Sequence, residues 1–339
     1  MYSDILERLP MANEKTIVVF GDYCLDKYLF IDALRDEPSV ETGLTAWQVG
    51  RKAIFPGAAG TVAKDILALG ARVVCVGFVG EDGEGFEMLH ALEGLGANTS
   101  LMIKTPLLCT NTYTKPMRTE PDGRVWEMNR FDFRNFVETP DKVQEALIKN
   151  LREAVKTADA VVITDQFIER NLCVVTDRVR EELAAVAREN PRLIVFADSR
   201  ARIDEYRNIM VKCNNFECVR AVMPDHTGAI DRETLEKCGK ILESRNGRPV
   251  FITQGADGML IFGGREIFEA KGIPVTGEID IVGAGDAANS GIVLGLALGL
   301  SLEAAGMLGN MVASIAIKQI GVTGQATREQ VEALIKGLG

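Results

Sequence analysis

The chain has 339 residues, of which 47% are hydrophobic, and a formal net charge of −10. Its length and apolar content allow a large buried core, in one α/β domain or in two smaller ones. The excess of acidic side chains argues against nucleic acid or an anionic membrane as the main partner, because both repel negative charge. Seven cysteines without Cys-x-x-Cys pairs indicate reduced thiols and a cytoplasmic protein, and two histidines are too few for a His triad or a His-rich metal site.

Apolar runs and helical spacing alternate along the chain. Continuous apolar runs predict buried strands at residues 16–20, 73–79, 160–164, 193–197, 221–223 and 250–253. Apolar residues at helical spacing predict helices at residues 57–69, 86–95, 141–156, 172–189, 287–300 and 301–318. Such alternation with short links is typical of a three-layer αβα, doubly wound and mostly parallel sheet, with its site at the carboxyl ends of the strands. We expect residues 1–339 to form one domain of this class.

Two segments interrupt this alternation, at about residues 27–56 and 101–131. Both show alternating polar and apolar residues, and the second contains a Pro-Asp-Gly turn at residues 121–123. Each segment therefore predicts short antiparallel strands that project from the α/β body. Together they predict one small β lid made from two separate parts of the chain.

The most informative segment is Ile-Asp-Ile-Val-Gly-Ala-Gly-Asp at residues 279–286, followed by an apolar run too short to span a membrane. It predicts a strand end, a glycine turn and the first turn of a buried helix. The small residues Gly283, Ala284 and Gly285 leave the backbone N–H groups of the helix start open to a phosphate. A carboxylate beside that anion site is explained if Asp286 removes the proton from a hydroxyl that attacks the phosphate. The segment favours a small-molecule kinase.

Two other interpretations fit the same residues. An aspartate in the first turn of a helix favours the helix dipole by about 0.3–1 kcal/mol without any chemistry. The run Gly-Ala-Gly-Asp-Ala-Ala also fits the loose dinucleotide-binding fingerprint, with Glu303 at a suitable distance. That fingerprint needs a strand that carries the acid, whereas residues 301–318 show a helical pattern. The dinucleotide interpretation is therefore the weaker one.

Eight stretches match one known family in the family's own order: residues 20–26, 56–63, 76–85, 129–133, 196–200, 212–217, 253–258 and the segment at Asp286. On these residues the chain resembles the ribokinase-like, or PfkB, carbohydrate kinases over nearly its whole length. Within that family it is most similar to the kinase domain that phosphorylates heptose 7-phosphate. The resemblance implies a ribokinase-like fold and transfer of phosphate from ATP to an alcohol.

The resemblance also implies roles for residues that contact the nucleotide. Asp286 is expected to be the general base, and the N–H groups of residues 283–285 are expected to form the anion hole. The family's Asn-x-x-Glu motif, here Asn214 and Glu217, organises Mg²⁺ near the nucleotide phosphates, although a helix cap with a solvated acid has the same pattern. The residues expected to line the nucleotide are Lys212, Asn214, Thr253, Gly255 and Gly258.

The acceptor side follows the family less closely. The residues expected to bind the substrate are Asp22, Asp26, Gly57, Ala58, Thr61, Arg130 and Asp132. Turn-forming aspartates and ordinary surface pairs give the same pattern. The usual Gly-Gly is Gly57-Ala58 here, and Thr61 replaces the usual Asn, so one hydroxyl stands where an amide would donate and accept. Val282 and Ala288 replace a Thr and a frequent Phe around the anion hole.

The sequence therefore predicts an ATP- and Mg²⁺-dependent kinase that phosphorylates a sugar or sugar phosphate, with a lid that closes over the acceptor. The resemblance further implies a monovalent cation such as K⁺ beside the anion hole, for which Asp280 and the loop at residues 321–324 are the candidates. It also implies a homodimer formed by pairing of lids. A nucleoside kinase of the same fold and a sugar-binding pseudo-kinase regulator are the alternatives.

Overall fold

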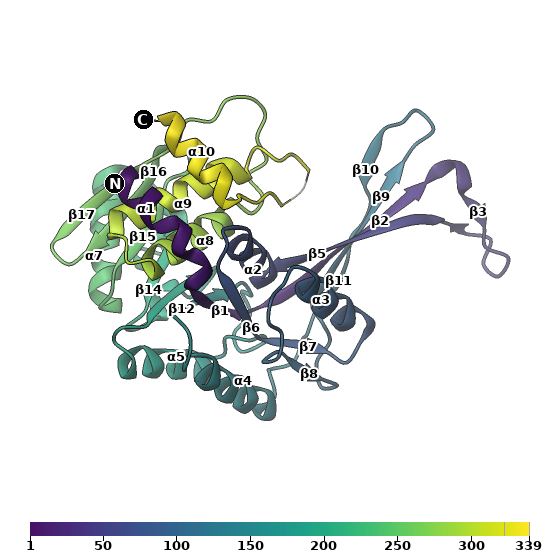
Figure 1. The fold of residues 1–339 in the computed structure, drawn as a ribbon. Helices are drawn as coiled ribbons and strands as arrows, with labels where there is room; N and C mark the ends of the chain where they lie inside the picture. Colours follow the sequence, from purple (N-terminus) through teal and green to yellow (C-terminus); the bar gives the residue numbers. More distant parts are fainter. Residues whose placement is uncertain (322, 339) are drawn as a thin grey trace.

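An eight-stranded sheet forms the centre of the computed structural model, which describes residues 1–321 and 323–338 (Figure 1). Its strand order is β17-β16-β15-β14-β13-β12-β1-β6. The six parallel strands are β1 (Thr16–Gly21), β6 (Arg72–Val76), β12 (Ala160–Asp165), β13 (Ile194–Ser199), β14 (Met210–Asn214) and β15 (Val250–Thr253). The antiparallel strands β16 (Gly258–Gly263) and β17 (Glu266–Lys271) extend one edge. The predicted αβα class with a mostly parallel sheet is confirmed.

Helices cover both faces of this sheet, each over its own hydrophobic cluster. One face carries α1 (Tyr2–Arg8), α2 (Ala59–Ala68), α3 (Gly83–Gly94), α8 (Ala284–Ala297), α9 (Leu302–Ala316) and α10 (Arg328–Leu338). The other face carries α4 (Asp141–Ala154), α5 (Asp177–Glu189), α6 (Asn215–Val222) and α7 (Arg232–Asn246). Strand β1 is buried on both sides, since Ile17 and Val19 face the first cluster while Val18 and Phe20 face the second. Burial on both faces explains why the central strands are apolar without alternation.

Helix α8 is buried from Ala287 to Leu296 and packs closely on α9. A Cβ atom added to Gly291 would lie 2.8 Å from the Cα atom of Gly309. The two backbones can approach this closely only because both positions lack a side chain. The packing fixes α8 in the core, so its first turn presents Asp286 at a defined place.

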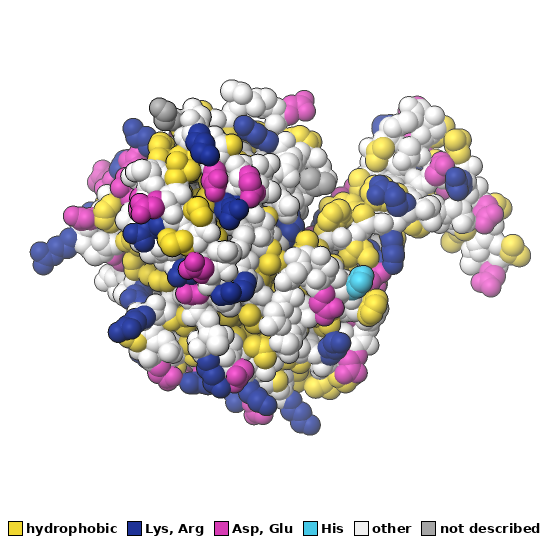
Figure 2. Space-filling view, in the orientation of Figure 1, with side chains coloured by type: hydrophobic (Ala, Val, Ile, Leu, Met, Phe, Trp, Pro, Cys, Tyr) yellow, Lys and Arg dark blue, Asp and Glu magenta, His cyan; other side chains and the backbone are white. Residues whose placement is uncertain are grey.

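A second sheet forms the predicted lid. Its strands are β2 (Tyr23–Asp32), β5 (Val49–Ala58), β9 (Thr112–Thr119), β10 (Val125–Glu127) and β11 (Phe131–Phe133). Strands β2 and β9 pair in parallel and the other pairs are antiparallel. The short pair β3 (Glu37–Pro38) and β4 (Thr45–Ala46) follows β2. The lid stands apart from the rounded body and exposes hydrophobic side chains (Figure 2).

Several predicted boundaries differ from the structure. The predicted strand at residues 221–223 is wrong, because Ala221 and Val222 form the last turn of α6. The predicted helix at residues 172–189 begins only at Asp177, where the side chain of Thr176 caps it. Residues 73–79 are divided between β6 and the short strand β7 (Phe78–Gly80), which pairs with β8 (Ile103–Thr105). Within the described residues, no helix is both long and apolar enough to cross a membrane.

Candidate active site

The carboxyl ends of β13 and β14 and the first turn of α8 meet at one edge of the central sheet. Asp198 is the fifth residue of β13 and lies opposite Lys212 of β14 in the parallel register. The Lys212 Nζ atom lies 2.6 Å from Asp198 Oδ2, and the Asn289 Nδ2 atom of α8 donates to the same oxygen at 2.7 Å. Asp198 and Lys212 are only 7% and 5% exposed. Shielding from water strengthens the ion pair that joins strand, strand and helix.

Lys212 also brings a positive charge to the N-terminus of α8. A Cβ atom at Gly285 would lie 3.3 Å from Lys212 Nζ. The negative charges of Asp198, Glu217 and Asp286 all favour the charged form of Lys212 and, against the effect of burial, raise its pKa. An ammonium group in this position adds to the partial positive charge of the helix N-terminus, so the site attracts phosphate.

The turn before α8, where the sequence predicts an anion hole, leaves part of the helix N-terminus without acceptors. Gly283 is the N-cap residue in the left-handed conformation, with φ of 81°, and no side chain caps the helix. The Ala284 N–H donates to the Ile281 carbonyl at 3.1 Å, so this N–H is already engaged. The N–H groups of Gly285 and Asp286 belong to the first turn, where the helix itself supplies no acceptors. The donors for an anion therefore centre on Gly285, not on Ala284.

Asp286 is half-buried at this helix start. Burial and the nearby Asp198 carboxylate raise the pKa of Asp286 to about 7, against the opposing charges of Lys212, Arg200 and Lys64. A carboxylate whose pKa lies near neutrality can accept a proton in one step of a reaction and release it afterwards. The position and the raised pKa both suit a general base.

Asn214 and Glu217 form a capping box at the start of α6. The Glu217 N–H donates to Asn214 Oδ1 at 2.8 Å, and the Asn214 N–H donates to Glu217 Oε2 at 2.9 Å. Burial, and next the Asp198 charge, raise the pKa of Glu217. The two residues do cap the helix, but the cap leaves the Asn214 amide nitrogen and one Glu217 oxygen available. Capping is therefore compatible with a role in the site. Of these two groups only the glutamate oxygen can coordinate a metal or accept a hydrogen bond from a metal-bound water.

Thr253, Gly255 and Gly258, which are expected to line the nucleotide, differ in what surrounds them. Thr253 ends β15 and its hydroxyl donates weakly to the Cys213 carbonyl at 3.5 Å. Gly255 has φ of 62° and open space around it, so it leaves a surface for a flat ligand. A Cβ atom at Gly258, with φ of 96°, would lie 2.3 Å from the Ala270 carbonyl oxygen. Gly258 is therefore required by the packing of β16 on β17.

On the acceptor side, Asp26, Gly57 and Lys115 lie together at the base of the lid. Lys115 Nζ lies 2.7 Å from Asp26 Oδ1 and donates to the Tyr28 hydroxyl at 3.2 Å. A Cβ atom at Gly57 would lie 2.6 Å from Asp26 Oδ2, so glycine makes room for this carboxylate. Both Asp26 and Lys115 are partly accessible, which suits contacts with the hydroxyls or charged groups of a sugar.

Asp22 and Thr61 have other partners. Asp22 is 1% exposed, and its carboxylate accepts from the Gln166 and Val174 N–H groups at 2.8 and 3.0 Å. Burial, followed by the Asp165 charge, raises the pKa of Asp22 to about 6. The Thr61 hydroxyl is buried and donates to the Pro56 carbonyl at 3.3 Å. Both side chains hold together the segments around the site, and their contact with an acceptor stays a prediction.

Three further predicted residues have distinctive geometry. Ala58, the N-cap residue of α2, has φ of 51° and ψ of −116°, a conformation that glycine adopts easily and alanine does not. Arg130 and Asp132 form a bidentate ion pair at 2.6 and 2.8 Å, with the Arg130 guanidinium over the Tyr113 ring. The pair lies on β11 and the turn before it, where the lid returns to the body, and it is partly exposed.

Asp280 ties two loops together beside the anion hole. Its carboxylate oxygens accept from the Val282 N–H at 3.0 Å and from the Gly321 N–H at 3.1 Å. The loop at residues 321–324, expected to share a cation with Asp280, includes Val322, which lies outside the described residues. Within the described residues, no group of three or more His, Cys, Asp or Glu side chains could hold a metal ion.

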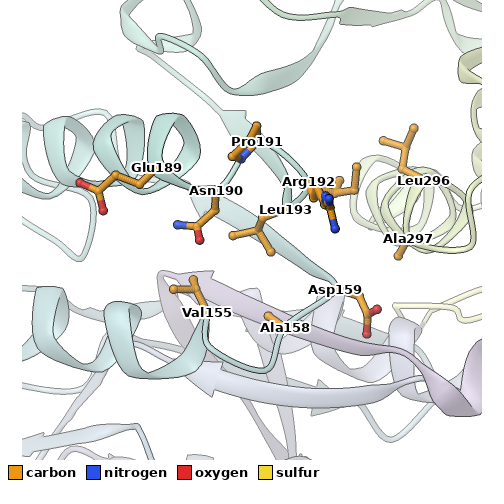
Figure 3. A pocket seen from close by; sticks show the side chains of 11 residues that line it. Val155, Ala158, Asp159, Glu189, Asn190, Pro191, Arg192, Leu193, Leu296 and Ala297 are labelled. Carbon is orange, nitrogen blue, oxygen red and sulfur yellow. The ribbon is translucent and has the colours of Figure 1, made fainter.

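A surface hollow of about 620 Å³ lies elsewhere on the molecule. Figure 3 shows its lining, which includes Asp159, Asn190 and Arg192. These residues come just before β12 and β13, at the amino ends of the parallel strands. The site at Asp286 lies at the opposite, carboxyl ends, where ligands of open α/β sheets bind. The hollow is therefore separate from the site.

Residues 15–328 match the family described as pfkB family carbohydrate kinase. The chain belongs to this family. Its membership confirms the predicted family of carbohydrate kinases and the predicted enzyme class, a phosphotransferase with an alcohol group as acceptor. The curated relatives include the bifunctional protein HldE of Desulfatibacillum aliphaticivorans, 27% identical over 93% of this chain and 62% of that protein. The chain thus spans less than two thirds of the length of this relative.

Solved structures share the fold of this PfkB kinase. Ribokinase of Arabidopsis thaliana, complexed with ribose and ATP, is 18% identical, with a TM-score of 0.68 over 95% of this chain and 98% of that chain. Phosphofructokinase-2 of Escherichia coli, in complex with potassium, is 16% identical, with a TM-score of 0.70 over 96% and 98%. At these identities the likeness establishes the fold, and the roles of residues depend on the geometry above.

Three charged residues of this kinase were not among the predicted site residues: Asp198, Lys64 and Lys115. A signal existed for Asp198, because it follows the apolar run at residues 193–197 and so lies at the carboxyl end of a predicted strand. No local pattern distinguishes Lys64 or Lys115. Lys64 is an unremarkable helix residue in sequence, and Lys115 meets Asp26 only through the pairing of β2 with β9.

Proposed function

We propose that this PfkB kinase transfers the γ-phosphoryl group of Mg²⁺-bound ATP to a sugar hydroxyl, with Asp286 as the general base. The observation that carries the proposal is one arrangement of charges. A carboxylate whose pKa is raised to about 7 lies in the first turn of α8, and the Lys212 ammonium lies beside Gly285 in the same turn. A helix N-terminus and a lysine attract the phosphoryl group, and the carboxylate accepts the proton of the attacking hydroxyl.

The proposed reaction uses two features of the first turn of α8: the Asp286 carboxylate and the positive groups around Gly285. Asp286 accepts the hydroxyl proton as the oxygen attacks, which base catalysis typically accelerates by about 10²–10⁴-fold. The N–H groups around Gly285 and the Lys212 ammonium stabilise the negative charge on the transferring phosphoryl oxygens. Asp198 holds Lys212 in position through their 2.6 Å contact. The ion pair with Asp198 therefore positions the Lys212 ammonium for the phosphoryl group.

Glu217 and Asn214 fit a water-mediated Mg²⁺ site. Mg²⁺ would neutralise charge on the nucleotide phosphates, and it usually keeps several waters and takes few protein ligands. The free oxygen of Glu217 can accept from such a water. The Asn214 amide nitrogen can donate to a phosphate oxygen or water, since its oxygen is engaged by the Glu217 N–H.

We propose that the acceptor lies between the lid and α2, against Asp26, Gly57 and Lys115. The accessible carboxylate and ammonium offer complementary contacts for hydroxyl groups and for a negatively charged substituent.

A monovalent cation beside Asp280 stays a prediction, and turnover measured in K⁺ and in tetramethylammonium chloride would check it. All seven cysteines, which lie within the described residues, are free thiols and support a reducing compartment.

Replacing Asp286 tests the central assignment. We expect Asp286→Asn to keep the fold and ATP binding but to lower turnover by about 10² or more, because only the proton transfer of the transition state is lost. The matched control is Glu303→Gln, since Glu303 occupies the first turn of the next helix and acts there only on the helix dipole. Turnover is measured by coupled assay and folding by thermal unfolding. Equal turnover in Asp286→Asn and wild type would remove Asp286 from the mechanism.

The acceptor itself is best identified by ligand stabilisation. Sugars, sugar phosphates and nucleosides are screened by thermal shift with a non-hydrolysable ATP analogue, because a ligand that binds only the folded state raises its stability. We expect a sugar or sugar phosphate to give the largest shift. If nucleosides alone stabilise the protein, the acceptor assignment fails while the role of Asp286 stands.

A further inference from the structure

Lys64 makes a contact that reaches across the molecule to the loop behind the anion hole. It lies on α2, and its Nζ atom donates to the Thr323 backbone carbonyl at 2.6 Å, across 259 positions of the chain. The Lys64 side chain is 17% exposed, so the contact is largely shielded from water. A hydrogen bond that starts from a charged donor is stronger than a neutral one, particularly when it is shielded.

Thr323 in turn lies directly against the turn that begins α8. A Cβ atom at Gly283 would lie 2.6 Å from the Thr323 Cγ2 atom. The same loop is fastened at Gly321, whose N–H donates to Asp280, while Asp280 also accepts from the Val282 N–H. The Asp280 carboxylate thus joins the turn at residues 280–283 to Gly321. Lys64, on α2, holds the neighbouring residue Thr323 from the other side.

Lys64 also contributes charge to the site. Its neighbour Asp65 lies 3.8 Å away and is fully buried, and neither of its carboxyl oxygens has a hydrogen-bond partner within the described residues. Burial raises the pKa of Asp65 well above its usual value, against the opposing Lys64 charge, and so favours the neutral form of this acid beside the Lys64 ammonium. Charged or titratable groups that act on Asp286 are Asp198, Lys212, Arg200, Lys64 and Asp65.

We propose that Lys64 is a positioning residue for phosphoryl transfer: it holds the Thr323 loop against the Gly283 turn and keeps a positive charge near Asp286. The inference rests on the proposed role of Asp286 and adds a second residue that acts through it. Because the N-cap residue of α2, Ala58, directly follows the proposed acceptor residue Gly57, Lys64 also links the helix of the acceptor side to the anion hole.

Three variants separate the contact from the charge. Lys64→Met removes both, and we expect kcat to fall about 10-fold to 100-fold with a smaller change in the KM for ATP, because the anion hole acts mainly in the transition state. Loss of the positive charge raises the pKa of Asp286, so the acid limb of the pH profile of kcat moves to higher pH. Lys64→Gln keeps a donor for Thr323 without charge, so it recovers most of kcat but keeps the displaced limb.

Lys318→Met is the matched control. Lys318 is an exposed lysine just after α9, near the same loop, and its loss should leave kcat and the acid limb unchanged. Thermal unfolding checks that each variant is folded, and Lys64→Gln carries the test by its displaced limb if Lys64→Met does not fold. Wild-type kcat with an unmoved limb in a folded Lys64→Met, or an unmoved limb in Lys64→Gln, overturns the inference. Failure of Asp286 itself is distinguished by Asp286→Asn, which tests the base in a chain that keeps Lys64.

Discussion

At the scale of single residues, the charge state of Asp286 depends on Asp198, a neighbour whose carboxylate contacts Lys212 and Asn289. Asp198 is the largest charge that raises the pKa of Asp286, which reaches about 7. A base must be deprotonated to act, so activity is expected to rise with pH through this region and to be lost as the pH falls below it. Burial alone sets part of the shift, and Asp198 supplies a part that mutation can remove.

We expect Asp198→Asn to move the acid limb of the kcat/KM profile to lower pH. The substitution removes a repelling negative charge and leaves Lys212 without its carboxylate partner, and both changes favour the ionised form of Asp286. Glu181→Gln, an exposed acid on α5, is the control for the loss of one negative charge. A limb that stays in place or moves to higher pH contradicts the assigned cause of the shift.

Ala58 offers a test of backbone strain at the acceptor side. Its φ of 51° and ψ of −116° form a backbone conformation that residues with a Cβ atom rarely adopt, and such strain costs about 1–3 kcal/mol. Ala58→Gly removes that cost and loses about 0.4–1 kcal/mol through the more flexible unfolded chain. We expect a net gain of about 1 kcal/mol in the free energy of unfolding, measured in urea. Ala59→Gly, one residue into α2, should be destabilising, and a destabilised Ala58→Gly would show that the strain is absent.

At the scale of elements, the contact between α8 and α9 holds the catalytic turn in place. The Cβ atom of Gly291→Ala would meet the Gly309 backbone at 2.8 Å, so the helices must separate. We expect a loss of about 1–3 kcal/mol in the free energy of unfolding, typical of overpacking. Gly94→Ala on α3 has open space and should be neutral or stabilising, as alanine favours helix. Equal effects of the two substitutions in urea denaturation would show that α8 and α9 tolerate separation.

The predictability of the site also follows from the elements. Asp286 and its glycine turn lie within eight consecutive residues, so the local pattern predicts a helix start with a carboxylate. The contact between Lys212 and Asp198 depends on the adjacency of β13 and β14, which local patterns do not specify. Strand β14 itself was not predicted, because the buried Lys212 interrupts its apolar run. The apolar residues at 221–223 belong instead mostly to the end of a helix that the Asn214–Glu217 box begins.

At the scale of the whole molecule, the outer part of the lid exposes large hydrophobic side chains. Leu34, Leu44 and Trp47 are 76%, 72% and 46% exposed on the outer part of the lid. Figure 2 shows such side chains on an arm that stands away from the body. Exposed apolar patches of this kind mark association surfaces. We therefore propose that two lids pair in a homodimer, as the family resemblance implies.

We expect wild type to sediment as a dimer and Leu44→Glu/Trp47→Glu to sediment as a monomer, because two buried charges would oppose lid pairing. Ile168→Glu places one charge on an exposed apolar residue of the body and is the control. Sedimentation equilibrium over a range of concentrations gives the masses. A wild-type monomer, or an unchanged dimer in the double variant, rules out pairing through this surface.

The parallel pairing of β2 with β9 has a consequence for how substrates are chosen. Asp26 lies on β2, Lys115 on β9 and Gly57 on β5, and these strands are hydrogen-bonded to one another in one sheet. Any tilt of that sheet carries the three residues together as a rigid plate and leaves their mutual spacing intact. In the acceptor site proposed above, the spacing of these three residues is set within the lid sheet itself, so they can select an acceptor independently of the base on α8.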